Sequence, residues 1–153
     1  MSVDPRSKLA SILALMFSAT SLANDMVAGD ERHMHAIHII LGKQVISASL
    51  EDSPATRDLI SQLPLSIDLA DYSAKEKIAY LPHKLDTSGA PAGIDPDVGD
   101  VTYYAPWGNL AIFYRDFGYS VGLIKLGSIT NGLEHLGYSG SRQAIIKLAP
   151  AKK

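Results

Sequence analysis

The chain has 153 residues, of which 46% are hydrophobic and 20% are charged, and its formal net charge is −2. This length and apolar content predict one soluble globular domain with a single core, and they exclude a disordered or membrane-embedded chain. The balanced charge provides no basic surface for phosphate groups, so nucleic acid is not an expected partner. The lack of cysteine excludes disulfides, thiol nucleophiles and thiolate metal sites.

The first 23 residues have the pattern of a cleavable secretory signal peptide. Arg6 and Lys8 precede an apolar run over residues 9–17, and residues 21–23 (Ser-Leu-Ala) present small side chains at the positions that signal peptidase reads. The run is shorter than the roughly 20 residues of a spanning helix, so no stable membrane span is expected. We therefore expect a periplasmic or secreted protein. The alternative is an N-terminal amphipathic helix that belongs to the domain.

The folded domain is expected over residues 35–150, after a short polar leader over residues 24–34 that is predicted to be disordered. Apolar residues at 36–41 and 44–50, joined by a Gly-Lys pair, predict a β-hairpin. A serine followed by proline then predicts a helix over residues 53–62.

The rest of the chain is dominated by short strands. A stretch rich in proline and glycine over residues 82–100 predicts a surface loop that is a candidate ligand-holding segment. Thr130 is expected to cap a second short helix that ends at Leu136. Further strands are expected over residues 65–69, 77–81, 101–104, 109–114, 123–129 and 143–148. So many short strands predict a mainly β fold that closes into a barrel, because an open sheet would leave exposed edges.

Three segments resemble, in order and spacing, successive core segments of cyclophilins. They are residues 99–102 (Gly-Asp-Val-Thr), 108–112 (Gly-Asn-Leu-Ala-Ile) and 126–134 (Leu-Gly-Ser-Ile-Thr-Asn-Gly-Leu-Glu). The longer run from Lys77 to Leu136 is more similar to the bacterial cyclophilin-like domain family, which shares the cyclophilin fold without a settled activity. The resemblance implies a closed eight-stranded cyclophilin-like β-barrel capped by two short helices.

Cyclophilins rotate X-Pro bonds, and the resemblance implies an arginine that draws on the lone pair of the prolyl nitrogen. Where that family has Phe-His-Arg, this chain has residues 80–82 (Tyr-Leu-Pro), and Asp97 stands where the family has a glutamine. Leu123 falls at the position of the active-site histidine, and Tyr119 stands near the position of a tryptophan. No catalytic residue is assigned, and a divergent peptidyl-prolyl cis-trans isomerase is the alternative function.

Most of the aromatic residues lie between residues 80 and 119, and Arg115 lies among them. A strand that includes Ala111, Phe113 and Arg115 would carry all three on one face. An arginine beside aromatic rings can hold an anionic or carbonyl group of a ligand. The alternative is a structural Arg115 that pairs with Asp116 or Asp100. The candidate ligand-binding residues are Tyr104, Trp107, Phe113, Arg115 and Tyr119.

Two clusters have some features of metal sites, and neither has a complete ligand set. His33 and His35 would point together from a strand, but His38 would point to its opposite face. The acidic segment 95–100 lacks the central glycine and the closing glutamate of a calcium loop. We therefore expect neither a metal nor a cofactor.

Together these patterns predict an exported domain of unassigned activity that binds a small molecule or peptide through an aromatic and arginine-bearing face of the barrel. A third hypothesis is an oligomer-forming module in which Trp107 and Tyr104 are buried between subunits. The sequence does not specify the oligomeric state.

Overall fold

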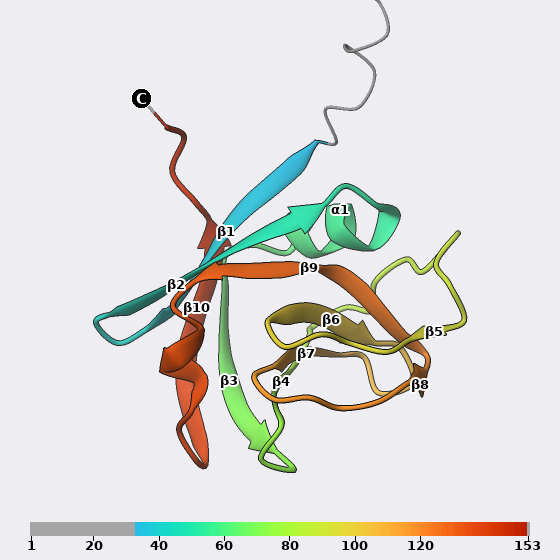
Figure 1. Ribbon diagram of the computed structural model, residues 1–153. Coiled ribbons are helices and arrows are strands. Elements are labelled where there is room, and N and C mark those ends of the chain that lie inside the picture. The colour runs from blue at the N-terminus through green and yellow to red at the C-terminus, as the bar shows by residue number, and fades with distance from the viewer. Residues whose placement is uncertain (1–32, 153) are drawn as a thin grey trace, which may run out of the picture. The chain divides into compact units, whose positions relative to one another are not determined.

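The computed structural model describes residues 33–152, which are built around antiparallel strands (Figure 1). The strands of the main sheet are β1 (Met34–Leu41), β2 (Gln44–Glu51), β3 (Leu65–Tyr72), β4 (Glu76–Tyr80), β6 (Asp100–Tyr104), β7 (Asn109–Phe113), β9 (Leu123–Asn131) and β10 (Ser141–Leu148). These eight strands close in the order β1-β10-β3-β4-β7-β6-β9-β2. The predicted closed eight-stranded barrel is therefore confirmed.

The N-terminal half follows the sequence prediction closely. Gly42 has a φ of 59° in the two-residue turn between β1 and β2, a left-handed conformation that glycine adopts without strain. Helix α1 (Pro54–Ser61) begins after Ser53, whose hydroxyl oxygen accepts a hydrogen bond of 3.0 Å from the Thr56 amide. The strand β1 begins at Met34, whereas the domain was expected to begin at residue 35. The expected signal peptide and residues 24–32 of the expected leader lie outside the described residues.

The second predicted helix ends at Leu136 as expected, but it starts later than predicted and is a single 3-10 turn. Thr130 does not cap it, because β9 continues to Asn131, which pairs with Ser47 of β2. Gly132, with a φ of 90°, then turns the chain into a short 3-10 helix, η1 (Leu133–Leu136). Within residues 33–152 the barrel is thus accompanied by one α-helix and one 3-10 turn, so the predicted two short helices slightly overstate the helical content.

The loop over residues 82–100 is mostly irregular, as predicted, but it contains a short strand. This strand, β5 (Gly93–Ile94), pairs with β8 (Ser120–Val121) as a separate two-stranded sheet. Figure 1 shows β5 and β8 together at one end of the barrel, close to the start of β9. The pair therefore ties the long loop to the segment that follows β7.

Apolar side chains gather on both faces of one part of the barrel wall. The interior core takes inward-facing residues from all the main strands, among them the fully buried Leu110 and Ile112 of β7. A second, smaller cluster lies on the other face, where Ile78, Ala111 and Phe113 pack against Leu123. Because strand residues alternate between faces, β7 supplies both clusters. The outer cluster forms the base on which the candidate site is built.

Lys77 is a charged residue buried completely in the barrel, with 0% of its surface exposed. Its ammonium group donates to the carboxylate of Asp71 and to the backbone carbonyl of Tyr138. It also lies 4.1 Å from the ring centroid of Tyr138 and 4.7 Å from that of Tyr114. Tyr114 in turn donates its hydroxyl to Asp71 at 2.5 Å. The lysine is therefore fully partnered, which is the condition for tolerating a buried charge.

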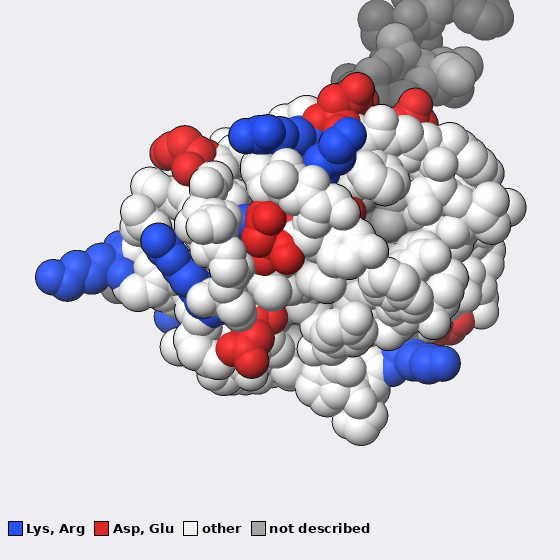
Figure 2. Space-filling view, turned by 90° about the horizontal axis from the view of Figure 1, so that it is seen from below, with Lys and Arg blue, Asp and Glu red and all other residues white. Residues whose placement is uncertain are grey.

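Over the described part of the chain, no helix is long and apolar enough to cross a membrane. On the face seen in Figure 2, acidic and basic side chains are interspersed, several of them side by side, and much of the remaining surface is uncharged. This face offers no extended area of one charge sign for a strongly charged partner.

Candidate functional site

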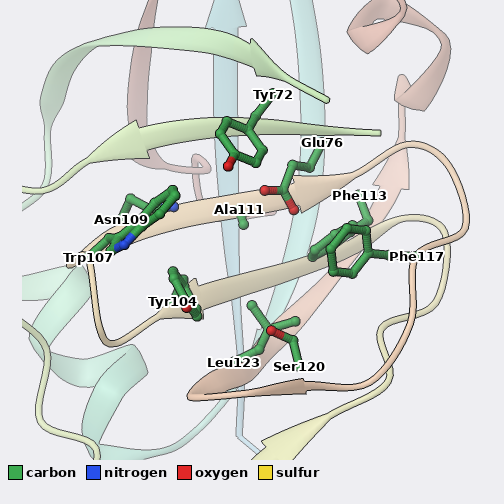
Figure 3. Close-up of a pocket in the computed structure, with 10 residues that line it drawn as sticks. All are labelled: Tyr72, Glu76, Tyr104, Trp107, Asn109, Ala111, Phe113, Phe117, Ser120 and Leu123. Carbon is green, nitrogen blue, oxygen red and sulfur yellow. The ribbon is translucent and has the colours of Figure 1, made fainter. Parts of the chain in front are cut away.

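A pocket of about 220 Å³ opens on the outer face of the barrel wall (Figure 3). It lies over the small outer apolar cluster, and five of its lining side chains are aromatic. The lining residues are Tyr72, Glu76, Tyr104, Trp107, Asn109, Ala111, Phe113, Phe117, Ser120 and Leu123. Aromatic walls with a few polar groups are typical of small-molecule sites.

The strand register brings the pocket residues together. Glu76 on β4 lies opposite Tyr72 on β3 and opposite Phe113 on β7. Asn109 at the start of β7 lies opposite Tyr104 at the end of β6. Side chains that are paired across antiparallel strands project from the same face of the sheet, so this pairing produces one continuous lining. The pocket is a direct consequence of the order β3-β4-β7-β6 in the barrel.

Trp107 packs between two tyrosine rings on one side of the pocket. Its ring centroid lies 5.7 Å from that of Tyr72 and 5.4 Å from that of Tyr104, with interplanar angles of 81° and 78°. Edge-to-face packing of this kind fixes ring orientation. Trp107 sits in the turn between β6 and β7, where the Gly108 amide donates to the Tyr104 carbonyl at 2.9 Å. Its side chain remains 49% exposed, so one surface is left for a ligand to cover.

The opposite side of the pocket is formed by two phenylalanines. The ring centroids of Phe113 and Phe117 are 5.4 Å apart. Phe113 is buried on β7, whereas Phe117 lies in the segment after β7 and is 42% exposed. The ammonium group of Lys75 lies 5.8 Å from the Phe117 centroid, at the rim. The pocket therefore has a buried ring in its inner wall and partly exposed rings at its mouth.

Glu76 is the acidic group of the pocket, and it is only 9% exposed. Figure 3 shows its carboxyl group directed into the space between the rings. Burial raises the pKa of Glu76 from 4.5 to about 7, because the charged form loses its hydration. Among residues 33–152, no lysine, arginine or histidine lies within ion-pairing distance of this carboxyl. The pocket thus holds a buried acid that has no counter-charge from the described chain.

Asn109 provides a second polar group with unused bonding capacity. Its side-chain nitrogen donates to the Leu110 carbonyl at 3.0 Å. Its side-chain oxygen is buried and has no hydrogen-bond partner in the described structure. A buried acceptor without a partner is unfavourable, and sites that bind ligands are one place where such groups occur.

The structure places three of the five predicted site residues in the pocket, namely Tyr104, Trp107 and Phe113. Arg115 and Tyr119 do not line it. The amides of Tyr114 and Arg115 both donate to the Lys75 carbonyl, at 3.0 and 3.2 Å, so the chain turns directly after β7. The expected alternation therefore ends before Arg115, whose guanidinium lies exposed, 5.9 Å from the Tyr114 ring.

The alternative prediction, in which Arg115 has a structural role and pairs with Asp100, is also not what the structure shows. Asp100 pairs with Lys125 at 2.9 Å and accepts a further hydrogen bond from Ser128 at 3.2 Å. Tyr119 is 62% exposed, and its hydroxyl group lies close to Gly93 of β5. The loop over residues 82–100 does not line the aromatic pocket; part of it lines a different hollow beside α1.

Several pocket residues were not identified from the sequence. Glu76 stands just before the predicted strand 77–81. Because it is two residues before the apolar Ile78, strand alternation could have predicted that Glu76 and Ile78 share one face of the sheet. Tyr72 and Phe117 lie beyond the ends of the strands predicted over residues 65–69 and 109–114. Only the tertiary arrangement brings Tyr72 beside Trp107 and Phe117 against Phe113. Asn109 gives no local signal that its amide is buried.

The positions that correspond to the cyclophilin active site are only partly gathered in the pocket. Leu123 contributes to its lining, whereas Tyr80 is 60% exposed and is not among the lining residues. The described lining contains no arginine. For metals, no group of three or more His, Asp and Glu side chains within residues 33–152 is arranged to hold an ion.

The fold and the pocket define a closed antiparallel barrel with an aromatic site on its outer wall. The chain belongs to the Cyclophilin-like family, whose model matches residues 39–147. The chain is also similar to the solution structure of a hypothetical protein from Archaeoglobus fulgidus, with a TM-score of 0.59 and 15% identity over 79% of this chain and 99% of that chain. At this identity the likeness shows the shared fold. No curated protein matches the sequence.

Proposed function

We propose that this protein is a binding domain that holds a small molecule in the aromatic pocket on the outer wall of the barrel. The observation that carries the proposal is the combination of five aromatic side chains with the buried Glu76 and the unpaired oxygen of Asn109. A face that served only to pack the barrel would not bury an acid without a partner. Rings for contact and a few polar groups for orientation are what a ligand site requires.

The size of the pocket favours a small ligand. Its volume of about 220 Å³ is below the roughly 300–1,000 Å³ of sites for drug-sized molecules. The partly exposed rings of Tyr72, Trp107 and Phe117 stand at its mouth and would be covered on binding. A compact molecule, or a single side chain of a peptide, fits these dimensions.

We further propose that the protein is periplasmic or secreted. The support is the signal-peptide pattern of residues 1–23, which lie outside the described part of the chain. Prolyl isomerisation remains the alternative activity. It has less support from the pocket, because the described lining lacks the arginine on which the cyclophilin mechanism depends.

Ala111 allows a direct test of the binding function. This residue is 1% exposed and lies at the base of the pocket, so Ala111→Leu would fill the space with three further carbon atoms. We expect fragment mixtures to give saturation-transfer NMR signals with the wild type and to lose them with Ala111→Leu. Ala36→Leu, at an exposed position on β1 that does not line the pocket, is the matched control. Fragments that bind all three proteins equally, or none of them, would contradict the proposed function.

A further inference from the structure

The electrostatics of the pocket are unusual for an apolar hollow, because its charged group is a carboxyl surrounded by ring faces and edges. Glu76 is fixed on β4 between Tyr72 and Phe113, its neighbours on the adjacent strands. Aromatic faces carry partial negative charge, so rings and carboxylate act on a bound charge in the same direction. Both favour a positive charge and disfavour a negative one.

None of the other residues that line the pocket around Glu76 carries a positive charge to balance its carboxylate. β3 contributes the phenol of Tyr72, and β6 contributes that of Tyr104. The lining residues of β7, β8 and β9 are uncharged. The nearest cationic group identified at the pocket is Lys75, whose ammonium group lies over the Phe117 ring at the rim and makes no ion pair with Glu76. An ammonium group and an outer ring of the pocket thus lie within cation–π range of each other.

We propose that the ligand is a small organic cation, a protonated or quaternary amine, which the aromatic rings contact and for which Glu76 is the counter-charge. This inference rests on the ligand-binding function proposed above and specifies its ligand class. The rings exclude water from the cation, and the carboxylate then interacts with it at a lower effective dielectric than in solution. The unpaired oxygen of Asn109 is an additional acceptor for an N–H or O–H group of the ligand.

Choline and 3,3-dimethylbutan-1-ol form a matched pair of probes, because they share one shape and differ in the charge of one central atom. Trp107 is the single tryptophan of the chain and lines the pocket, so its fluorescence reports binding directly. We expect choline to bind at least about tenfold more tightly than the neutral isostere, as cation–π contact combined with an ion pair predicts.

Two variants test whether Glu76 causes the preference for choline over its neutral isostere. Glu76→Gln keeps the size of the side chain and removes its charge, so the preference for choline over the isostere should fall to the smaller part that the rings contribute. Glu51→Gln removes an exposed carboxylate at the end of β2 and should leave the preference unchanged. Thermal unfolding of both variants verifies that they are folded.

The outcomes separate the two proposals. Equal binding of choline and its isostere would overturn the cationic class while the binding function stands. The same conclusion follows if choline fails to bind the wild type, whereas neutral or anionic fragments bind it and do not bind Ala111→Leu. If neither probe nor any fragment binds the wild type, both proposals fail. A choline preference that is undiminished in Glu76→Gln would remove Glu76 as the counter-charge and overturn the inference.

Discussion

Glu76 and Lys77 are neighbours on β4, and their side chains lie on opposite faces of the barrel wall. Glu76 lies in the outer pocket, whereas Lys77 is buried inside and bonded to Asp71 and to the Tyr138 carbonyl. Strand alternation therefore keeps apart two opposite charges that are adjacent in sequence. One charge is satisfied by the fold, and the other is left available to a ligand.

The first prediction concerns the buried pair of Lys77 and Asp71. Burial by itself would raise the pKa of Asp71, but hydrogen bonds from Lys77 and Tyr114 outweigh it, and the pKa is lowered. Lys77→Met would leave Asp71 without its cation. We expect a loss of about 3 kcal/mol in the free energy of unfolding, measured by urea denaturation.

The exposed lysine Lys147 provides the control, and Lys147→Met should change stability by less than about 0.5 kcal/mol. The double variant Asp71→Asn with Lys77→Met should recover part of the loss, because it removes the unpaired charge. If Lys77→Met were as stable as the wild type, the pair would not hold the barrel together.

The second prediction tests Arg115, which the sequence suggested and the pocket geometry does not include. Its guanidinium is exposed and lies 5.9 Å from the Tyr114 ring, a contact of small energetic weight. We expect Arg115→Ala to change the free energy of unfolding by less than about 0.5 kcal/mol and to leave fragment binding intact. Loss of binding with normal stability would restore Arg115 to the site, as the sequence predicted.

The third prediction concerns export. Mass spectrometry of the protein from its native host should find a mature chain that begins at Asn24, because cleavage after residues 21–23 is what the small side chains predict. A chain that still begins at Met1 and fractionates with the cytosol would show that the localisation is wrong. The barrel and its pocket do not depend on this result.

The fourth prediction concerns isomerase activity. In a proline-peptide isomerisation assay we expect the uncatalysed rate, because the described pocket lining supplies no arginine to the prolyl nitrogen. An authentic cyclophilin serves as the positive control. Acceleration that Ala111→Leu abolishes would establish a divergent isomerase that uses this pocket.

The sequence predicted the barrel well, because alternation and turn residues are local signals. Gly42 marks a hairpin turn, and Ser53 with Pro54 marks the start of α1. The second helix was misjudged because the pairing of Asn131 with Ser47 extends β9, and no local signal reports that pairing.

The candidate site was predicted only in part. Tyr104 and Trp107 flank one turn and could be grouped from sequence alone, whereas Glu76 joins them through the pairing of β4 with β7. Arg115 was included because the strand was expected to continue, and the turn at Tyr114 ends it. Burial of an acid is a tertiary property, which neither composition nor periodicity contains.

The final prediction is a pH dependence that originates from Glu76. Burial raises its pKa to about 7 in the folded state, above the ordinary value of 4.5. The folded state therefore retains a proton that the unfolded chain has lost. Its contribution to stability is fully present below pH 4.5 and is lost as the pH rises through 7. Relative to Glu76→Gln, we expect the wild type to lose roughly 2 kcal/mol over this interval, since each pKa unit corresponds to about 1.4 kcal/mol and water at the pocket mouth reduces the effect.

The ionisation of Glu76 also determines whether the affinity for choline rises or falls with pH. A cation favours the ionised carboxylate, so choline should bind more tightly as the pH rises through 7, and binding should release a proton. Calorimetry in two buffers of different ionisation enthalpy measures that proton, and Glu76→Gln should release none. All other titratable groups are common to both proteins, so their effect cancels in the comparison. Affinity that falls as the pH rises would mean that the protonated acid binds the ligand, which would exclude Glu76 as a counter-charge.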